Sequence, residues 1–175
     1  AHVDWVVTGR MRGSLEFLGQ KCSAASRAYH PDNLWPQIKE SLVAEVKTIK
    51  VGSPEQLENF MTAVIDRNSF NKIKSYIDYV KQSDDAEILC GGKCDDTIGY
   101  FVEPTIVVAK SAHFKTMVEE IFGPVLTIYV YPADDFEGAM DLVDSTSEYA
   151  LTGAIFSHDR YAIDRATKRL VNAAG

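Results

Sequence analysis

A seven-residue apolar run constrains the fold of this chain more than any other feature. Residues 125–131 read Val-Leu-Thr-Ile-Tyr-Val-Tyr, a stretch of β-branched, aliphatic and aromatic residues without interruption. The run lacks the polar–apolar alternation of a strand with one solvated face, so it predicts a strand buried on both sides. Such a strand needs covering elements on both faces of its sheet.

Helical and strand patterns alternate along the rest of the chain. Apolar spacing and capping residues predict helices over 3–18, 33–49, 66–80, 135–144 and from about 159 onward. Strand patterns occupy 26–29, 87–90, 100–102, 105–108 and 151–156. This order predicts an α/β fold, a mostly parallel open sheet flanked by helices. We see no internal repeat or linker, so residues 1–175 are expected to form one domain segment.

Particular residues mark the ends of these helices. Gly19 is expected to end the first, because glycine enters the left-handed conformation without steric cost. Asp66 or Asn68 can cap the third helix, and Asp134 or Asp135 the fourth. Cys22 then lies in the first loop after a helix.

The charge balance and the chain ends exclude several classes of function. The formal net charge is −7, which would repel a phosphate backbone, so no nucleic-acid partner is expected. No apolar run is long enough for a transmembrane helix, and no membrane partner is expected. The first residues lack the pattern of a signal peptide and resemble a helix interior, which predicts that the sequence continues upstream.

The three cysteines provide no disulfide framework and suit a reducing compartment. Cys90 and Cys94 are separated by one residue more than a usual C-x-x-C pair, and no second pair follows at metal spacing. We therefore expect no metal site and interpret both as structural residues. Cys22 stands alone near a helix end, where backbone N–H groups can stabilise a thiolate. Isolated cysteines are more often inert core residues, so the position alone decides nothing.

A second motif lies about a hundred residues further on. Residues 119–125 read Glu-Glu-Ile-Phe-Gly-Pro-Val, with two carboxylates and an aromatic ring before a Gly-Pro corner. By themselves these would be a solvated helix end and a core phenylalanine.

In this order, Gly19-Gln20-Lys21-Cys22 and residues 119–125 resemble the NAD(P)-dependent aldehyde dehydrogenases. Ser23-Ala24 and residues 91–96, 102–104 and 144–147 are further similar to the glutamate γ-semialdehyde (1-pyrroline-5-carboxylate) dehydrogenase branch. The resemblance implies an aldehyde-dehydrogenase catalytic-domain fold. It also implies NAD-dependent oxidation of the semialdehyde to glutamate in proline catabolism.

The resemblance assigns roles to four residues. Cys22 would be the catalytic nucleophile, with its backbone N–H supporting the oxyanion. Glu120 would bind the hydroxyls of the nicotinamide ribose, and Phe122 would pack against the ribose and nicotinamide. Ser23 would hydrogen-bond the substrate, although a small polar residue in a tight loop is an equal interpretation.

Other parts of the family's active site find no counterpart in the sequence. These are the cofactor domain, the general-base glutamate, the asparagine that donates to the oxyanion, the C-terminal anchor loop for the substrate and the hairpin used for oligomerisation. No G-x-G-x-x-G follows a strand either. We therefore expect little or no dehydrogenase activity from these residues alone, because catalysis falls steeply without its positioning partners. The resemblance implies that the parent enzyme is a homo-oligomer of the mitochondrial matrix, with the cytoplasm as the alternative location.

Two alternatives belong to other classes. The chain could be a catalytically silent binding or structural domain derived from an aldehyde dehydrogenase. It could also be a cysteine hydrolase, which requires Cys22 to lie within hydrogen-bond reach of His30 or His113. A smaller departure is Ala150, where the family usually has glycine; alanine is strained there only if the backbone is left-handed.

Overall fold

The computed structural model describes residues 2–173. Its elements, in chain order, are α1 (Val3–Leu15), the 3₁₀ helix η1 (Glu16–Gly19), β1 (Arg27–Pro31), α2 (Trp35–Val46), α3 (Arg67–Lys81), β2 (Ala86–Cys90), β3 (Cys94–Asp95), β4 (Phe101–Val102), β5 (Thr105–Ala109), α4 (Lys115–Val118), β6 (Val125–Tyr131), α5 (Phe136–Ser145) and α6 (Arg160–Arg169). Within these residues no helix combines the length and apolar character needed to cross a membrane.

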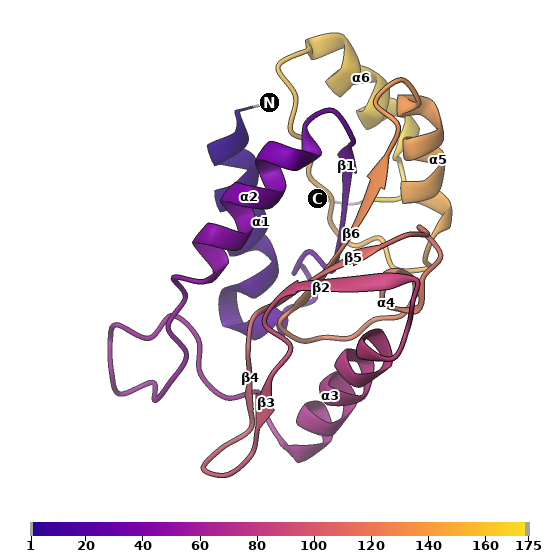
Figure 1. Cartoon of the computed structure of the whole chain (residues 1–175). Helices are drawn as coiled ribbons and strands as arrows, with labels where there is room; N and C mark the ends of the chain where they lie inside the picture. The colour runs from indigo at the N-terminus through magenta and orange to yellow at the C-terminus, as the bar shows by residue number, and fades with distance from the viewer. Residues whose placement is uncertain (1, 174–175) are drawn as a thin grey trace.

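Four strands form the main sheet in the order β1-β6-β5-β2. β6 runs parallel to both of its neighbours, and β2 joins the edge antiparallel to β5. Figure 1 shows α1 and α2 on one side of this sheet and α5 on the other. The mostly parallel sheet flanked by helices is therefore confirmed. β3 and β4 form a separate two-stranded ribbon, of which the sequence indicated only β4.

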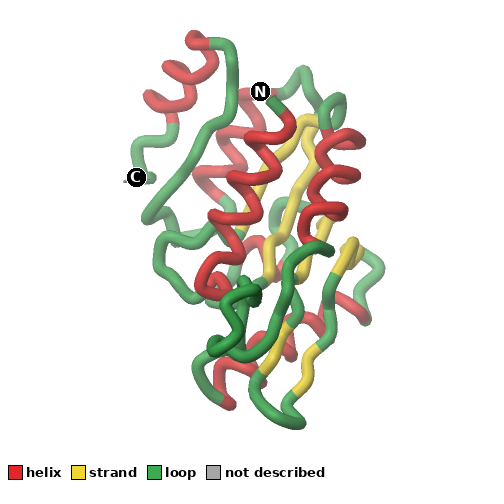
Figure 2. The backbone as a smooth tube through the Cα atoms, turned by 90° about the vertical axis from the view of Figure 1, so that its left-hand side faces the viewer, coloured by secondary structure: helices red, strands yellow, loops and turns green. Residues whose placement is uncertain are grey.

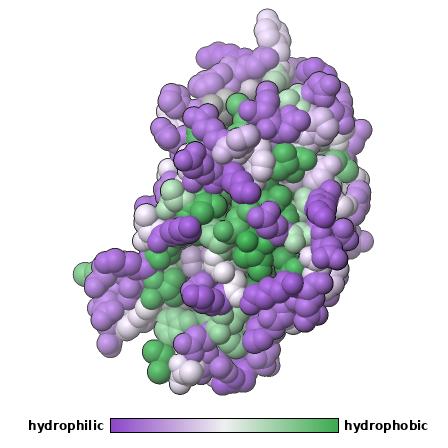
Figure 3. Space-filling view, viewed as in Figure 1, coloured by the Kyte–Doolittle hydropathy of each residue, from purple (hydrophilic) through white to green (hydrophobic). Residues whose placement is uncertain are grey.

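β6 is the centre of the core, as its apolar run predicts. Leu126, Thr127 and Ile128 are all 0% exposed, so both faces of the strand are covered. The Thr127 hydroxyl donates to the hydroxyl of Thr116 at 2.8 Å, so this buried polar group is not left without a hydrogen-bond partner. On the face seen in Figure 3, apolar residues gather near the middle and hydrophilic ones surround them.

Aspartates cap three helices, and the structure chooses between the predicted alternatives. Asp66 accepts a hydrogen bond from Ser69 N at 2.7 Å, and Asp135 accepts one from Gly138 N at 2.9 Å. Asp159 accepts from Tyr161 N at the start of α6. Each cap satisfies N–H groups that a helix start leaves unpaired.

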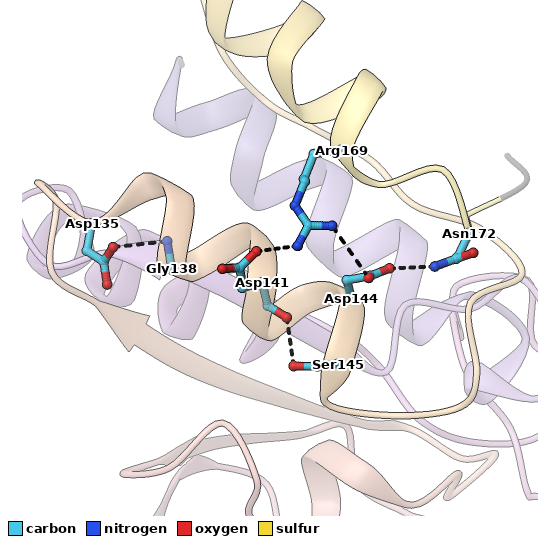
Figure 4. Close-up of polar contacts among 7 residues, drawn as sticks. All are labelled: Asp135, Gly138, Asp141, Asp144, Ser145, Arg169 and Asn172. Carbon is cyan, nitrogen blue, oxygen red and sulfur yellow. Dashed lines mark hydrogen bonds and ion pairs between the residues drawn. The ribbon is translucent and has the colours of Figure 1, made fainter.

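Polar contacts join α5 to α6 on the surface (Figure 4). Arg169 donates to Asp141 and lies 3.7 Å from a carboxylate oxygen of Asp144. Asn172 donates to Asp144 at 2.7 Å. Because these groups are largely exposed, the pairs orient the last helix more than they stabilise the fold.

Two predicted elements differ from the structure. The helix over 3–18 ends at Leu15, because Phe17 and Leu18 already have positive φ before Gly19 is reached. Residues 151–156 form no strand. Their apolar pattern is that of a strand, but pattern alone cannot supply a ladder partner. Figure 2 shows the loop before α6 running beside α1, where Phe156 lies against Arg10 with 5.3 Å between guanidinium carbon and ring centroid.

His30 is a buried titratable group on the main sheet, in β1. Its ring stacks on Trp35 with 5.7 Å between centroids, and its Nε2 has no partner among the described residues. Burial, with a contribution from the Arg10 charge, lowers the pKa of His30 to about 3. Since the unfolded chain binds this proton near its ordinary pKa of 6.5, the folded state loses stability as pH falls below that value.

We predict that His30→Gln removes part of the acid sensitivity of the fold. When the pH is lowered from about 7.5 to about 5, the free energy of unfolding of the wild type should fall by roughly 2 kcal/mol, because His30 gains a proton only in the unfolded chain. Glutamine does not titrate, so the variant should lack this contribution. Urea unfolding at the two pH values measures this difference. His113→Gln, at an exposed position, is the control for the general effect of replacing a histidine. An unchanged slope in His30→Gln would show that His30 does not titrate on unfolding.

Candidate active site

The two sequence motifs meet at a pair of glycines. Gly19 has φ of +63°, and a Cβ built on it would overlap the carbonyl oxygen of Gly123. The same Cβ would lie 2.8 Å from the carbonyl oxygen of Ser14. Glycine is therefore required here both by backbone angle and by space. The approach brings the loop that carries Cys22 against the loop that carries Glu119 and Glu120.

A left-handed turn precedes this meeting point. Phe17, Leu18 and Gly19 have φ values of 51°, 60° and 63° in succession. Non-glycine residues in this region carry strain, which persists where surrounding structure over-determines it. Leu18 is buried and contributes to the hydrophobic core, whereas the Phe17 side chain is exposed.

Gln20 fixes the Cys22 loop to the start of α3. Its side-chain Oε1 accepts from the backbone N–H of Ile65 at 3.0 Å and from the Ser69 hydroxyl at 3.4 Å. Gln20 belongs to the motif around Cys22, but no role for its side chain was predicted from the sequence. The structure shows that it connects the loop to a helix some 45 residues away in sequence.

Cys22 lies in a turn closed by a hydrogen bond from Ala24 N to the Lys21 carbonyl at 3.0 Å. Its side chain is exposed, so the thiol is accessible from solvent. Among the described residues, the backbone N–H of Cys22 donates to no acceptor. A free N–H beside a nucleophile is the kind of donor that stabilises an oxyanion.

The structure distinguishes the two adjacent carboxylates, which the sequence could not do. Glu119 accepts a hydrogen bond from the Tyr76 hydroxyl at 2.6 Å. Burial, followed by this bond, raises the pKa of Tyr76 to about 12, so it remains a donor at neutral pH. The exposed carboxylate of Glu120 accepts no hydrogen bond from the described residues. It is therefore the one available for ligand hydroxyls.

Lys72 binds the backbone carbonyl of Glu120, whereas the Glu120 side chain points to solvent. Its ammonium donates to the Glu120 carbonyl at 2.8 Å, from one turn inside α3. Ile73, the next residue, lies beneath Gly123, where an added Cβ would come within 2.5 Å of its Cδ1. The start of α3 therefore supports both loops, a role that the sequence analysis did not assign.

Phe122 faces an open groove. Its φ of 61° is left-handed, and 40% of the residue is exposed, so it is not the core residue that its type alone would suggest. The groove, of about 480 Å³, lies between the two loops and the start of α3; it is lined by Phe17, Leu18, Gln20, Ile65, Asn68, Ser69, Lys72, Ile121 and Phe122. A flat apolar wall beside polar side chains can bind a partly aromatic ligand.

Glu120 lines a different groove, of about 550 Å³, together with Tyr76, Glu119 and Tyr149. Cys22 lines neither of the two grooves. The structure thus brings the backbones of both motifs together but does not enclose Cys22, Glu120 and Phe122 in a single pocket. Ser23 is exposed beside Cys22, with a free hydroxyl among the described residues.

The remaining candidates of the sequence analysis lie elsewhere. No hydrogen bond of the described residues joins Cys22 to a histidine, and His30 is buried against Trp35, so nothing here favours the hydrolase. Cys90 and Cys94 are half-buried, and burial raises the pKa of both thiols. Across residues 2–173, no group of three His, Cys, Asp or Glu side chains is placed to hold a metal ion.

A protein-family model covers the segments that carry both motifs. The model described as the aldehyde dehydrogenase family matches residues 1–175. The chain belongs to the aldehyde dehydrogenase family. The family assignment confirms the resemblance inferred from the residues around Cys22 and Glu120.

Two curated relatives of this aldehyde dehydrogenase chain share a name. The mitochondrial delta-1-pyrroline-5-carboxylate dehydrogenase of Dictyostelium discoideum is 58% identical over 99% of the chain and 31% of its own length. The human protein of the same name is 53% identical over 100% of the chain and 31% of its own length. The chain therefore spans about a third of the length of these relatives.

Solved structures agree with the sequence relatives. The delta-pyrroline-5-carboxylate dehydrogenase of Mycobacterium tuberculosis, crystallised with NAD and cobalamin, superimposes with a TM-score of 0.94. It is 37% identical, and the match covers 100% of this chain and 32% of that one. A Thermus 1-pyrroline-5-carboxylate dehydrogenase with bound NAD gives a TM-score of 0.88 at 29% identity, over 97% of this chain and 32% of that one.

Proposed function

We propose that this chain is the nucleophile-bearing part of the catalytic domain of an NAD-dependent dehydrogenase. Its substrate would be glutamate γ-semialdehyde, which forms from 1-pyrroline-5-carboxylate, and its product glutamate. The observation that carries the proposal is the close approach of Gly19 to Gly123, which sets the Cys22 loop against the Glu120 loop. The identity to dehydrogenases of that name supports the choice of substrate.

The chemistry of Cys22 follows from its exposure and its free backbone N–H. The thiolate would attack the aldehyde carbon, forming a C–S bond and an oxyanion to which the Cys22 N–H donates. Hydride leaves that carbon readily because the oxyanion re-forms a carbonyl. The product is a thioester on Cys22, and water then releases glutamate and restores the thiol. Ser23 would hydrogen-bond the substrate from the next position.

The residues near Glu120 fit the nicotinamide end of NAD⁺, the group that accepts the hydride. The Glu120 carboxylate has no partner among the described residues, so it can accept hydrogen bonds from two ribose hydroxyls. Phe122, two residues further along the same loop, offers a half-exposed ring. Lys72 holds the backbone between them through the Glu120 carbonyl.

The proposal extends to parts of the enzyme outside these residues. A cofactor-binding domain, a general base and a loop for the substrate carboxylate would come from the remaining two thirds of a protein of the relatives' length. The names of the Dictyostelium and human relatives support a mitochondrial location. We propose a homo-oligomeric parent enzyme on the same basis of family membership.

A chimaera tests the proposal. These residues would replace the matching segment of the Dictyostelium relative, and NADH formation would be followed with 1-pyrroline-5-carboxylate and with propanal, which lacks the α-amino acid group. We expect turnover that strongly prefers the semialdehyde, and none from the isolated chain. A folded chimaera that binds NAD⁺ but does not turn over would contradict the proposal and favour a silent domain. Turnover by the isolated chain would show that the outside residues are dispensable.

A further inference from the structure

A segment between α5 and α6 makes contacts with both catalytic loops. This strap, residues 147–152, is exposed or half-buried along its length and belongs to no helix or strand. Its side chains and backbone make three hydrogen bonds to distant parts of the chain. From the sequence, only residues 144–147 and Ala150 were compared with the family, and no function was predicted for this segment.

The first end of the strap is fixed to the carboxylate loop. The hydroxyl of Ser147 donates to the Val118 carbonyl at 2.8 Å, directly before Glu119 and Glu120. The Ser147 hydroxyl also accepts from Tyr149 N at 3.3 Å, which tightens the turn. The side chain of Tyr149 then lines the same groove as Glu120.

The other end is fixed to the nucleophile loop. Thr152 donates its hydroxyl to the Ser23 carbonyl at 3.3 Å, one residue after Cys22. Between the two ends, Arg27 at the start of β1 donates from Nη2 to the Tyr149 carbonyl at 3.0 Å. Ala150 lies in this stretch with no positive φ, so the alanine that replaces the family's usual glycine is accommodated without strain.

The Cys22 turn has few other attachments on this side. Ala25 N donates to the Gly13 carbonyl at 2.8 Å, which holds the end of the turn to α1. The carbonyl of Ser23 accepts from no other donor among the described residues. The Thr152 hydroxyl therefore restrains the Ser23–Ala24 peptide, one residue beyond Cys22, and through the strap connects it to the peptide that precedes Glu119.

We propose that the strap is a positioning element that sets the Cys22 loop relative to the Glu120 loop, with Thr152 as its positioning residue at the nucleophile. The inference rests on the proposed function, because the distance that it fixes matters only if Cys22 and Glu120 serve one reaction. A small displacement of a reacting group is enough to slow a reaction severely while leaving ligand binding intact.

Thr152→Val in the chimaera tests the role, because valine keeps the shape and removes the hydroxyl. We expect kcat to fall about tenfold or more while KM for NAD⁺ stays the same. Thr152→Ser keeps a hydroxyl and should retain kcat near wild type. Thr48→Val is the matched control, since the exposed Thr48 hydroxyl also donates to a backbone carbonyl, that of Glu45 at 2.7 Å, but within one turn and away from both loops. Equal kcat values for Thr152→Val and Thr48→Val would overturn the proposal.

A second measurement separates this inference from the proposed function. In the isolated chain, Ala24 N and Ala25 N are hydrogen-bonded, so their amide exchange reports the order of the Cys22 turn. Thr152→Val should speed exchange at both amides by at least about threefold, and Thr48→Val should not. Unchanged exchange would refute the strap even if the enzyme is active. Faster exchange in a chain whose chimaera is inactive would support the strap while the proposed function fails.

Discussion

Gly19→Ala is expected to lower the free energy of unfolding by at least about 3 kcal/mol, because two penalties act at one atom. The residue has φ of +63°, where an alanine Cβ is strained, and the added methyl would overlap the Gly123 carbonyl oxygen. Neither Gly123 nor the Ser14 carbonyl is the end of a flexible side chain, so the backbone itself must shift. The shift would separate the Cys22 and Glu120 loops, so activity of the chimaera should also be lost.

Gly13→Ala is the control for this experiment. Gly13 lies inside α1, and its Cβ would meet only the Ala25 Cβ, at 4.0 Å. Alanine there should raise the free energy of unfolding by about 0.5 to 1 kcal/mol, because it reduces the conformational entropy of the unfolded chain. Urea unfolding of both variants gives the comparison. A Gly19→Ala protein as stable as the wild type would mean that the two loops do not approach as described.

Cys22→Ala is expected to reduce turnover of the chimaera by about a thousandfold or more, since no other group in the loop can form the thioester. The substitution removes only an exposed side chain, so the free energy of unfolding should change little. Binding of NAD⁺ should also persist, because Glu120 and Phe122 are unchanged. Steady-state NADH formation and calorimetric NAD⁺ binding measure the two effects.

The other two thiols provide the matched comparison. Cys90→Ala and Cys94→Ala remove half-buried side chains that pack against the core, so they should cost stability and leave kcat within a few-fold of wild type. If either of these variants lost turnover while Cys22→Ala stayed active, Cys22 would not be the nucleophile.

Local sequence signals predicted most of the helices and strands correctly. The apolar run over 125–131 is strand β6 residue for residue, because burial on both faces leaves its pattern in consecutive positions. Asp66 was one of two predicted caps for α3, and the start of the last helix near Asp159 was also predicted, since a helix start depends on contacts within four residues. The motifs around Cys22 and Glu120 indicated the aldehyde dehydrogenase family, which the family model confirms.

Errors arose where distant parts of the chain decide the local conformation. Residues 151–156 have the composition of a strand but form none, because a strand requires a partner as well as a pattern. The first helix ends at Leu15 because the chain turns left-handed before reaching Gly19. No pattern of apolar spacing in the sequence indicates that change of backbone conformation.

The sequence by itself determined the α/β class, the family and the two motifs, because periodicity, caps and motif residues act over short distances along the chain. Only the tertiary structure decided how the motifs meet. It placed Gly19 against Gly123, engaged Glu119 with Tyr76 so that Glu120 remains available, and connected Thr152 to the Cys22 loop. These contacts join residues that are 43 to 129 positions apart, and packing of the whole chain, not local preference, sets such distances.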